Sequence, residues 1–321
     1  MRAPDFWKND GLAARLLAPL GALYGLSVRR RQQRARPYRS KARVLCVGNL
    51  TAGGSGKTPV AMALAWMLEA RGQTVVFLSR GYGGRLSGPV RVDPAKHSAA
   101  DVGDEALLLA DIAPTVVARD RARGAELAES LGVQVIVMDD GFQNFQLAKD
   151  VSIVVVDADS GFGNGRLIPA GPLREPVEQG LKRADAVVLM GDGGFAIPTF
   201  HGPVFRAVLR PSASNGLAGR AVFAIAGIGR PEKFFGTLQA MGARVVGSRA
   251  FPDHHPYAAH EIEAARREAA NADALLVTTE KDLVRIEATR RDGIIAVPVH
   301  AVFADDPNPG MMLDRLAKSR A

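Results

Sequence analysis

The segment Thr51–Pro59, with the sequence T-A-G-G-S-G-K-T-P, constrains the fold of this chain more than any other segment. It follows the apolar run Val44–Val47 and precedes a helical pattern. A strand, a glycine-rich turn and Lys-Thr at the start of a helix form the arrangement that cradles nucleotide phosphates. Lys57 can reach the β and γ oxygens, and the Thr58 hydroxyl can bind Mg²⁺. The segment therefore predicts an α/β protein that uses ATP or GTP.

The loop departs from the common phosphate-binding pattern at its first position, where Thr51 stands in place of glycine. The glycines that follow still supply the backbone freedom that the turn needs. We expect these residues to bind the nucleotide: Thr51, Gly53, Gly54, Ser55, Gly56, Lys57 and Thr58.

Apolar runs alternate with helical patterns along the chain, which predicts an α/β fold with a parallel sheet. Several runs are nearly continuous in β-branched residues, as is typical of strands buried on both faces. The helix predicted at Pro59–Ala70 is apolar nearly all round, so it should pack on that sheet. Strands are predicted at Val44–Leu50, Thr74–Leu78, Thr115–Val117, Val133–Met138, Val151–Val156 and Ala186–Met190.

The length of 321 residues exceeds one typical core, so we expect two domains. Residues 191–220 are rich in Gly, Pro and Ser and should connect them. A second α/β alternation follows, with strands at Ala221–Ala226, Arg244–Gly247, Ala274–Thr278 and Ile294–Val299 and helices at Glu232–Met241 and Ala259–Ala270. The predicted organisation is an arm at 1–43, a phosphate-loop domain at 44–215 and a smaller α/β domain at 216–321 that completes a cleft.

The net charge of +8 is concentrated in one short segment, because residues 29–43 carry eight basic and no acidic side chains. The rest of the chain is close to neutral, whereas a nucleic-acid-binding fold spreads its positive charge over a face. We therefore expect no nucleic-acid partner. The single cysteine, Cys46, excludes a disulfide framework or a Cys-based zinc site within one chain and suits the reducing cytoplasm.

An apolar stretch, Leu12–Val28, lies directly before the basic segment. With an internal Arg15 and Pro19 it is at the short limit for a membrane span. A helix lying in the membrane interface, with the adjacent arginines on anionic head groups, is the interpretation that we favour. The alternatives are a core helix followed by a solvated basic linker and, more weakly, a nucleic-acid contact.

Carboxylates occur at two places where they could serve phosphoryl transfer. Asp139 and Asp140 end an apolar strand, where phosphate-loop proteins place the carboxylate that holds Mg²⁺ or its water shell; one of the two could instead be a turn residue. Asp104 and Glu105 precede an apolar helical run. Asp104 is either a helix cap or the acceptor of a hydroxyl proton, and the pattern does not choose.

Other candidate residues lie in loops after predicted strands. Tyr82, within R-G-Y-G-G, and Arg121 could contact a phosphate, a sugar or a lipid. Arg174 could bind an anion or pair with its neighbour Glu175. The histidines of Phe251–Tyr257 could bind a metal or orient a carboxylate, and the charges of Thr278–Asp282 could form an interdomain contact or a helix start.

The motifs occur in a specific order over nearly the whole chain: GNLTAGGSGKTP, SRGYGG, VGDE, DDGFQN, GPLREP, FPDHHPY and TTEKD. This series resembles the tetraacyldisaccharide 4′-kinase family, the lipid A 4′-kinases of Gram-negative bacteria. The resemblance implies two Rossmann-like domains and transfer of the γ-phosphate of ATP to the 4′-hydroxyl of a tetraacyldisaccharide 1-phosphate. It further implies Mg²⁺ and a peripheral or monotopic place at the cytoplasmic face of the inner membrane. We infer no obligatory protein partner.

Carried onto this sequence, the resemblance implies a role for each candidate. Lys57 handles the phosphates, Asp104 is the base toward the 4′-hydroxyl, and His254 orients it. The metal side is formed by Thr58, Asp139, Asp140 and Glu105. The sugar and phosphate of the lipid are contacted by Tyr82, Arg121 and Arg174.

Two other functions use a similar loop. A membrane-peripheral switch or partitioning ATPase usually carries a lysine early in the loop, where this chain has Ala52. A nucleic-acid-stimulated NTPase would fit the arginines of the arm but not the near-neutral remainder of the chain.

Overall fold

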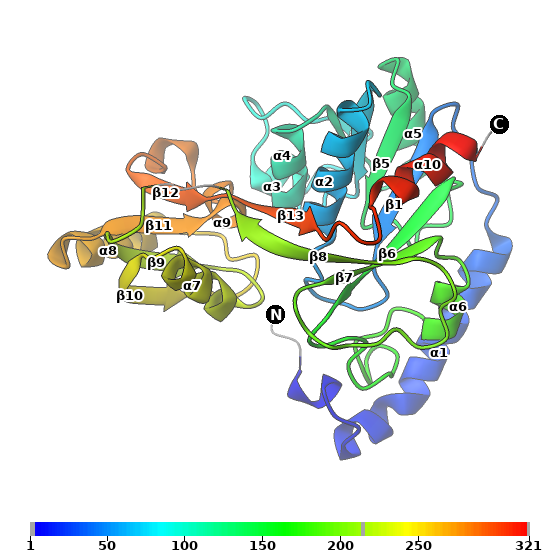
Figure 1. The fold of residues 1–321 in the computed structure, drawn as a ribbon, viewed down its shortest axis with the longest axis horizontal. Helices are drawn as coiled ribbons and strands as arrows, with labels where there is room; N and C mark the ends of the chain where they lie inside the picture. The colour runs from blue at the N-terminus through cyan, green and yellow to red at the C-terminus, as the bar shows by residue number, and fades with distance from the viewer. Residues whose placement is uncertain (1–3, 213–215, 320–321) are drawn as a thin grey trace.

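The structure, a computed structural model, describes residues 4–212 and 216–319 and contains two α/β units that lie side by side (Figure 1). Within those residues the larger sheet has the strand order β13-β8-β7-β6-β1-β5-β2-β4-β3. Its strands are β1 Arg43–Gly48, β2 Val75–Ser79, β3 Val90–Arg91, β4 Thr115–Val117, β5 Val135–Asp139, β6 Val151–Asp157, β7 Ala186–Met190, β8 Val204–Pro211 and β13 Val299–Phe303. All neighbours pair in parallel except at the two edges, where β3 and β13 are antiparallel.

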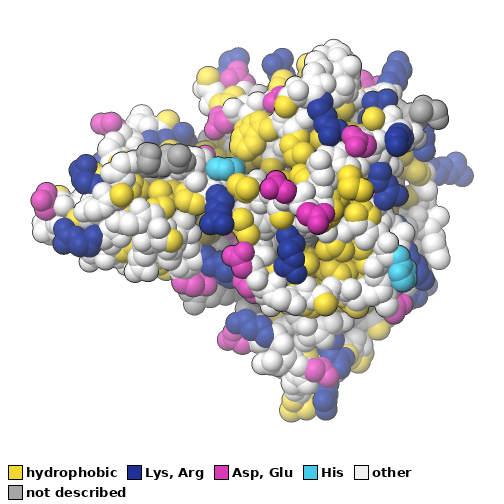
Figure 2. Space-filling view, in the orientation of Figure 1, with side chains coloured by type: hydrophobic (Ala, Val, Ile, Leu, Met, Phe, Trp, Pro, Cys, Tyr) yellow, Lys and Arg dark blue, Asp and Glu magenta, His cyan; other side chains and the backbone are white. Residues whose placement is uncertain are grey.

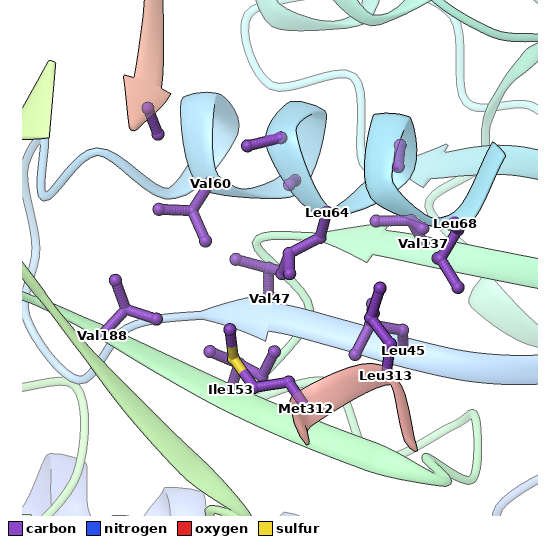
Figure 3. Close-up of a cluster of buried hydrophobic side chains, with 14 of the residues drawn as sticks. Leu45, Val47, Val60, Leu64, Leu68, Val137, Ile153, Val188, Met312 and Leu313 are labelled. Atoms are coloured by element: carbon purple, nitrogen blue, oxygen red, sulfur yellow. The ribbon is translucent and has the colours of Figure 1, made fainter. Parts of the chain in front are cut away.

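The central strand β1 is buried on both faces, because successive side chains point to opposite sides of the sheet. Leu45 and Val47 join the core under α2 (Lys57–Glu69) and α10 (Gly310–Lys318). Figure 3 shows Leu64 and Leu68 of α2 pointing towards this core. Val44 and Cys46 join the opposite core with side chains of α5 (Arg121–Ser130) and α6 (Val177–Leu181).

The smaller sheet is parallel throughout, with the order β10-β9-β11-β12. Its strands are β9 Ala221–Ala226, β10 Arg244–Ala250, β11 Leu275–Thr279 and β12 Ile294–Val297. The helices α7 (Pro231–Ala240) and α8 (Ala259–Asn271) pack on opposite faces of this sheet. Side chains of α7 share a core with one set of alternating β9 side chains, and side chains of α8 share a core with the other set. A short helix, α9 (Glu280–Leu283), follows β11 directly.

The C-terminal part of the chain differs from the prediction. The run Ile294–Val299 was expected to form one strand, but it divides at Pro298 into β12 of the smaller sheet and β13 of the larger one. Residues 191–220, expected to be a connection, contain β8, with which β13 pairs antiparallel. Leu313 and Leu316 of α10 are buried in the larger core. The boundary of 216–321 is therefore wrong for residues 299–318, since their apolar side chains find their core in the larger domain.

The N-terminal arm contains a short 3-10 helix, η1 (Asp5–Trp7), and a long helix, α1 (Leu12–Arg34), that runs along the larger domain (Figure 1). Gly21 and Gly25 permit close contact with Leu167, because a Cβ at Gly25 would lie 2.6 Å from its Cδ1. The opposite face exposes leucines at Leu12, Leu16, Leu20, Leu23 and Leu26. None of the described helices is both long enough and apolar enough to cross a membrane.

Acidic and basic side chains are intermingled on the face of the molecule drawn in Figure 2. This pattern agrees with the near-neutral charge of the chain outside its basic arm. The helices α3 (Ala99–Val102) and α4 (Asp104–Ala110) follow β3, and α4 contacts α9 of the smaller domain. A short 3-10 helix, η2 (Ala288–Arg290), lies between α9 and β12.

Candidate active site

The predicted phosphate loop connects the carboxyl end of β1 to the first turn of α2. Gly53 and Gly56 have φ values of +108° and +83°, which side chains rarely adopt. Ser55 is buried and accepts a 3.0 Å hydrogen bond from the Asn49 amide, which fixes the path of the loop. No side chain caps α2, so its first N–H groups are available to an anion.

The segment G-P-L-R-E-P runs beside this loop. The Ala52 amide donates to the Pro172 carbonyl at 2.7 Å, and the Arg174 amide donates to the Leu50 carbonyl at 2.8 Å. Thr51 forms an isolated bridge with Leu173. These backbone contacts bring the Arg174 side chain to the edge of the phosphate loop, as its predicted role in anion binding requires.

Asp139 and Thr58 meet where β5 and β1 end together, because Val47 is the register partner of Asp139. The Thr58 hydroxyl donates to Asp139 Oδ2 at 3.0 Å. Asp139 Oδ1 is buried and has no hydrogen-bond partner. Burial, followed by the nearby charges of Glu105 and Asp140, raises the pKa of Asp139 to about 7. An orphaned buried carboxylate oxygen beside a threonine hydroxyl fits a divalent cation.

Asp140 lies between two cations and has a φ of +49°, in the left-handed region. Arg174 donates to its Oδ1 at 2.7 Å, and Lys57 Nζ lies 3.8 Å from the same oxygen. Burial raises the pKa of Asp140, but the positive charges of Lys57 and Arg174 have the larger combined effect. The pKa of Asp140 is therefore below its usual value. Glu175, the other partner considered for Arg174, instead pairs with Arg183.

The carboxylates predicted to hold Mg²⁺ do not form a closed protein cage. Among the residues that the structure describes, no group of three or more His, Cys, Asp or Glu side chains is arranged to bind a metal. Mg²⁺ commonly keeps several waters and uses one or two carboxylates together with substrate phosphates. An Asp139–Thr58 pair facing a phosphate loop suits that kind of binding.

Asp104 is the first residue of α4, and it does not cap the helix. The residue at the N-cap position is Gly103, which has a φ of +87°. A side chain would not fit there, because its Cβ would lie 2.4 Å from the Tyr82 carbonyl oxygen. The Asp104 carboxylate is instead 4% exposed and contacts the smaller domain. His254 Nδ1 lies 3.1 Å from its Oδ2, and Arg285 Nε donates to the same oxygen at 2.8 Å. The structure thus brings together the predicted base and its predicted orienting histidine.

The surroundings of this pair contain further predicted residues. Tyr82 is 66% exposed, and its ring lies edge-on to His254 with centroids 5.6 Å apart. Glu105 accepts from Lys281 at 2.9 Å, so the T-T-E-K-D motif forms an interdomain contact as well as a helix start, with Thr279 as its cap. Glu105 also lies near enough to Asp139 for its charge to raise the pKa of that carboxyl.

Of the three residues predicted to contact the lipid, Arg121 is the one that is buried, whereas Tyr82 and Arg174 keep exposed surface. Its side chain is 2% exposed, and its Nη1 donates to the Ala118 carbonyl. In this arrangement it does not contact a lipid directly, because α5 begins at this residue and turns the side chain into the protein. His255 is partly buried in the smaller domain, where its Nε2 lies 2.8 Å from Glu261 Oε2.

Sequence reasoning missed Arg285. The T-T-E-K-D motif includes Lys281, and Arg285 lies four residues later, in the turn that follows α9. That spacing was the available signal, but only the fold places the carboxylate of Asp104 beside the Arg285 side chain.

Comparison with known proteins identifies the group to which this chain is related. The model of the tetraacyldisaccharide-1-P 4′-kinase family matches residues 13–318. The chain belongs to this family. The resemblance inferred from the ordered motifs, and with it the classification as a kinase, is confirmed.

Individual tetraacyldisaccharide 4′-kinases match over nearly the full length. That of Paramagnetospirillum magneticum is 54% identical over 304 residues, covering 93% of this chain and 94% of the relative. That of Rhodospirillum rubrum is 51% identical over 328 residues, covering 100% and 99%. The crystal structure of the kinase LpxK from Aquifex aeolicus in complex with ATP superimposes with a TM-score of 0.76 at 28% identity, covering 94% of this chain and 99% of that one.

Proposed function

We propose that this chain transfers the γ-phosphate of ATP to the 4′-hydroxyl of a tetraacyldisaccharide 1-phosphate, at the junction of its two domains. The observation that carries the proposal is the contact of Asp104 with His254 across that junction, near the phosphate loop. A neutral hydroxyl needs a group that accepts its proton and a γ-phosphate held in line with it. The two sides of the junction supply these groups.

The nucleotide side is built on the larger domain. The loop backbone and the free N-terminus of α2 bind the phosphates, and Lys57 contacts the β and γ oxygens. Thr58 and Asp139 would hold Mg²⁺, which when bound supplies positive charge to the phosphates. Asp140 keeps Lys57 and Arg174 together at the loop, and Glu105 supplies further negative charge beside Asp139.

The acceptor side is formed around Asp104. Its carboxylate takes the proton of the 4′-hydroxyl, while His254 holds one carboxylate oxygen by a hydrogen bond. Tyr82, exposed beside His254, offers a face for the sugar. Arg174, at the edge of the phosphate loop, offers a contact for a phosphate of the lipid.

The lipid acceptor requires the protein to work at a membrane surface, because acyl chains leave a bilayer reluctantly. The exposed leucines of α1 would enter the acyl boundary, and the arginines after them would meet anionic head groups. We propose on this basis that the chain acts at the cytoplasmic face of the inner membrane as a peripheral or monotopic protein.

The proposal is tested by incubating the protein with radiolabelled Mg·ATP and the lipid acceptor in mixed micelles. The label is expected in the lipid, and an acceptor with its 4′-hydroxyl blocked should take up none. ATP hydrolysis that ignores the acceptor, with no label in the lipid, would refute the proposal and favour an ATPase.

A further inference from the structure

Arg285 is a buried cation of the smaller domain, and all three nitrogens of its guanidinium are engaged. Its side chain is 5% exposed. Nε donates to Asp104 Oδ2 at 2.8 Å, and Nη2 contacts the same oxygen. Nη1 donates to the Gly227 carbonyl at 2.7 Å and to Asp282 Oδ1 at 3.0 Å. One end of the group therefore holds the larger domain, and the other end is fixed in the smaller one.

The fixed end rests on a saturated network. Asp282 has no exposed side-chain surface and accepts hydrogen bonds from the Gly227 amide at 3.0 Å and the Tyr257 hydroxyl at 2.9 Å. Its other oxygen accepts from the Thr279 hydroxyl at 2.6 Å. A guanidinium held by such a network has little freedom of rotation. It therefore moves together with the smaller domain.

Both groups that hold Asp104 contact the same oxygen. His254 and Arg285 engage Oδ2, and no hydrogen bond among the described residues engages Oδ1. A carboxylate held by two donors on one oxygen has a fixed plane, and its second oxygen keeps its lone pairs for another partner.

We propose that Arg285 is a positioning residue for phosphoryl transfer, which holds Asp104 Oδ2 so that Oδ1 is presented to the acceptor hydroxyl. The inference rests on the proposed role of Asp104 as the base. Because Asp104 and Arg285 belong to different domains, the base is oriented only when the domains are docked. Lys281 reinforces this docking through its 2.9 Å contact with Glu105, so adjacent carboxylates of α4 meet two cations that are four residues apart in the chain.

The alternative is that Arg285 only joins the domains. The two roles are separated by steady-state kinetics of Arg285→Lys and Arg285→Gln, with thermal stability and ATP affinity measured for each. Arg285→Gln removes the positive charge and the planar set of N–H donors of the guanidinium. Its kcat should fall about 100-fold because the base is misplaced, whereas KM for ATP should be nearly unchanged. Arg285→Lys keeps the charge and should recover part of kcat. Wild-type kcat in both variants would overturn the proposal.

A neighbouring arginine provides the matched control. Arg291 donates to the carbonyls of Val284 and Ile286, which flank Arg285, and contacts no active-site carboxylate. Arg291→Gln should therefore retain wild-type kcat even where its stability falls. A loss of kcat in Arg291→Gln equal to that in Arg285→Gln would mean that any weakening of this segment suffices, and it would contradict a positioning role.

A double-mutant cycle separates this inference from the proposed function. If Arg285 acts through Asp104, then Arg285→Gln should cause no further loss of kcat in an Asp104→Asn background. A further loss as large as in the wild-type background would overturn the inference. If Asp104→Asn alone keeps wild-type kcat, the proposed role of Asp104 fails first, whatever Arg285 does.

Discussion

Thr58 and Asp139 are joined by a 3.0 Å hydrogen bond that uses one carboxylate oxygen and leaves the other buried without a partner. The pair joins the first turn of α2 to the end of β5. The negative charge of Asp139 costs stability, because burial and the like charges of Glu105 and Asp140 outweigh the favourable effect of Lys57. A bound divalent cation would remove that cost.

Asp139→Asn should therefore separate stability from activity. Without Mg²⁺ the variant is expected to melt no lower than the wild type, since it removes a buried charge that its surroundings disfavour. With Mg·ATP its kcat should fall by about 1,000-fold or more, because a metal contributes several kcal/mol to phosphoryl transfer. Differential scanning fluorimetry with and without Mg²⁺, beside the kinase assay, measures both. A variant that melts well below the wild type yet keeps its activity would contradict the metal role.

Lys57→Ala should abolish phosphate transfer. The Lys57 side chain is 12% exposed and lies 3.8 Å from Asp140, so its removal takes a cation from the loop and leaves Asp140 with Arg174. The kinase assay should show at least about a 100-fold loss of kcat. Lys182→Ala, at an exposed lysine outside the loop, is the control and should behave as the wild type. Near-wild-type turnover of Lys57→Ala would refute the phosphate-loop role.

His254 should stabilise the fold more at low pH than at high pH. Its hydrogen bond with Asp104 raises the pKa of His254 above the usual value of 6.5, even though burial opposes this. The folded state then holds the proton more tightly than the unfolded state. The stabilisation is fully present below about pH 6.5 and is lost as the pH rises through the higher folded-state pKa.

The measurement compares urea unfolding of the wild type and His254→Gln at pH 6 and pH 8.5. The stability difference between the two proteins should be larger at pH 6, and differences common to both proteins cancel. An equal or larger difference at pH 8.5 would show that the imidazolium contact with Asp104 does not form.

The exposed leucines of α1 should bind membranes. Leu16 and Leu23 are 71% and 64% exposed, and burying a leucine side chain contributes about 1.5–3 kcal/mol. Each Leu→Ser change should reduce binding to anionic vesicles by roughly tenfold. Leu209→Ser, at an exposed leucine on β8, is the matched control and should leave co-sedimentation unchanged. Equal binding by all variants would mean that another surface meets the membrane.

The sequence predicted the interior of the larger sheet well, because strands buried on both faces leave nearly continuous apolar runs. The runs at Thr115–Val117 and Ala186–Met190 coincide with β4 and β7. The prediction failed at β8 and β13. β13 lies at the edge of the larger sheet and β8 lies beside it. Both strands carry polar residues, and they pair over nearly a hundred residues, so no local pattern marks their partnership.

In the candidate site, too, local features could be predicted from the sequence and contacts between distant elements could not. Glycine and lysine spacing marked the phosphate loop, and strand-end carboxylates marked Asp139, because these features are local. The partnership of Asp104 with Arg285 and the burial of Arg121 depend on how distant elements meet. Arg121 comes directly after a strand, a position typical of ligand-binding residues, but only the fold determines which way its side chain turns.

The central claim is that Asp104, held across the domain junction, takes the proton of the acceptor hydroxyl. Single-turnover transfer from radiolabelled Mg·ATP to the lipid acceptor by wild-type protein and Asp104→Asn tests it most directly, with ATP affinity measured on the same samples. The account predicts unchanged ATP affinity and a transfer rate lower by about 100-fold or more in the variant. Transfer at the wild-type rate by Asp104→Asn would contradict it.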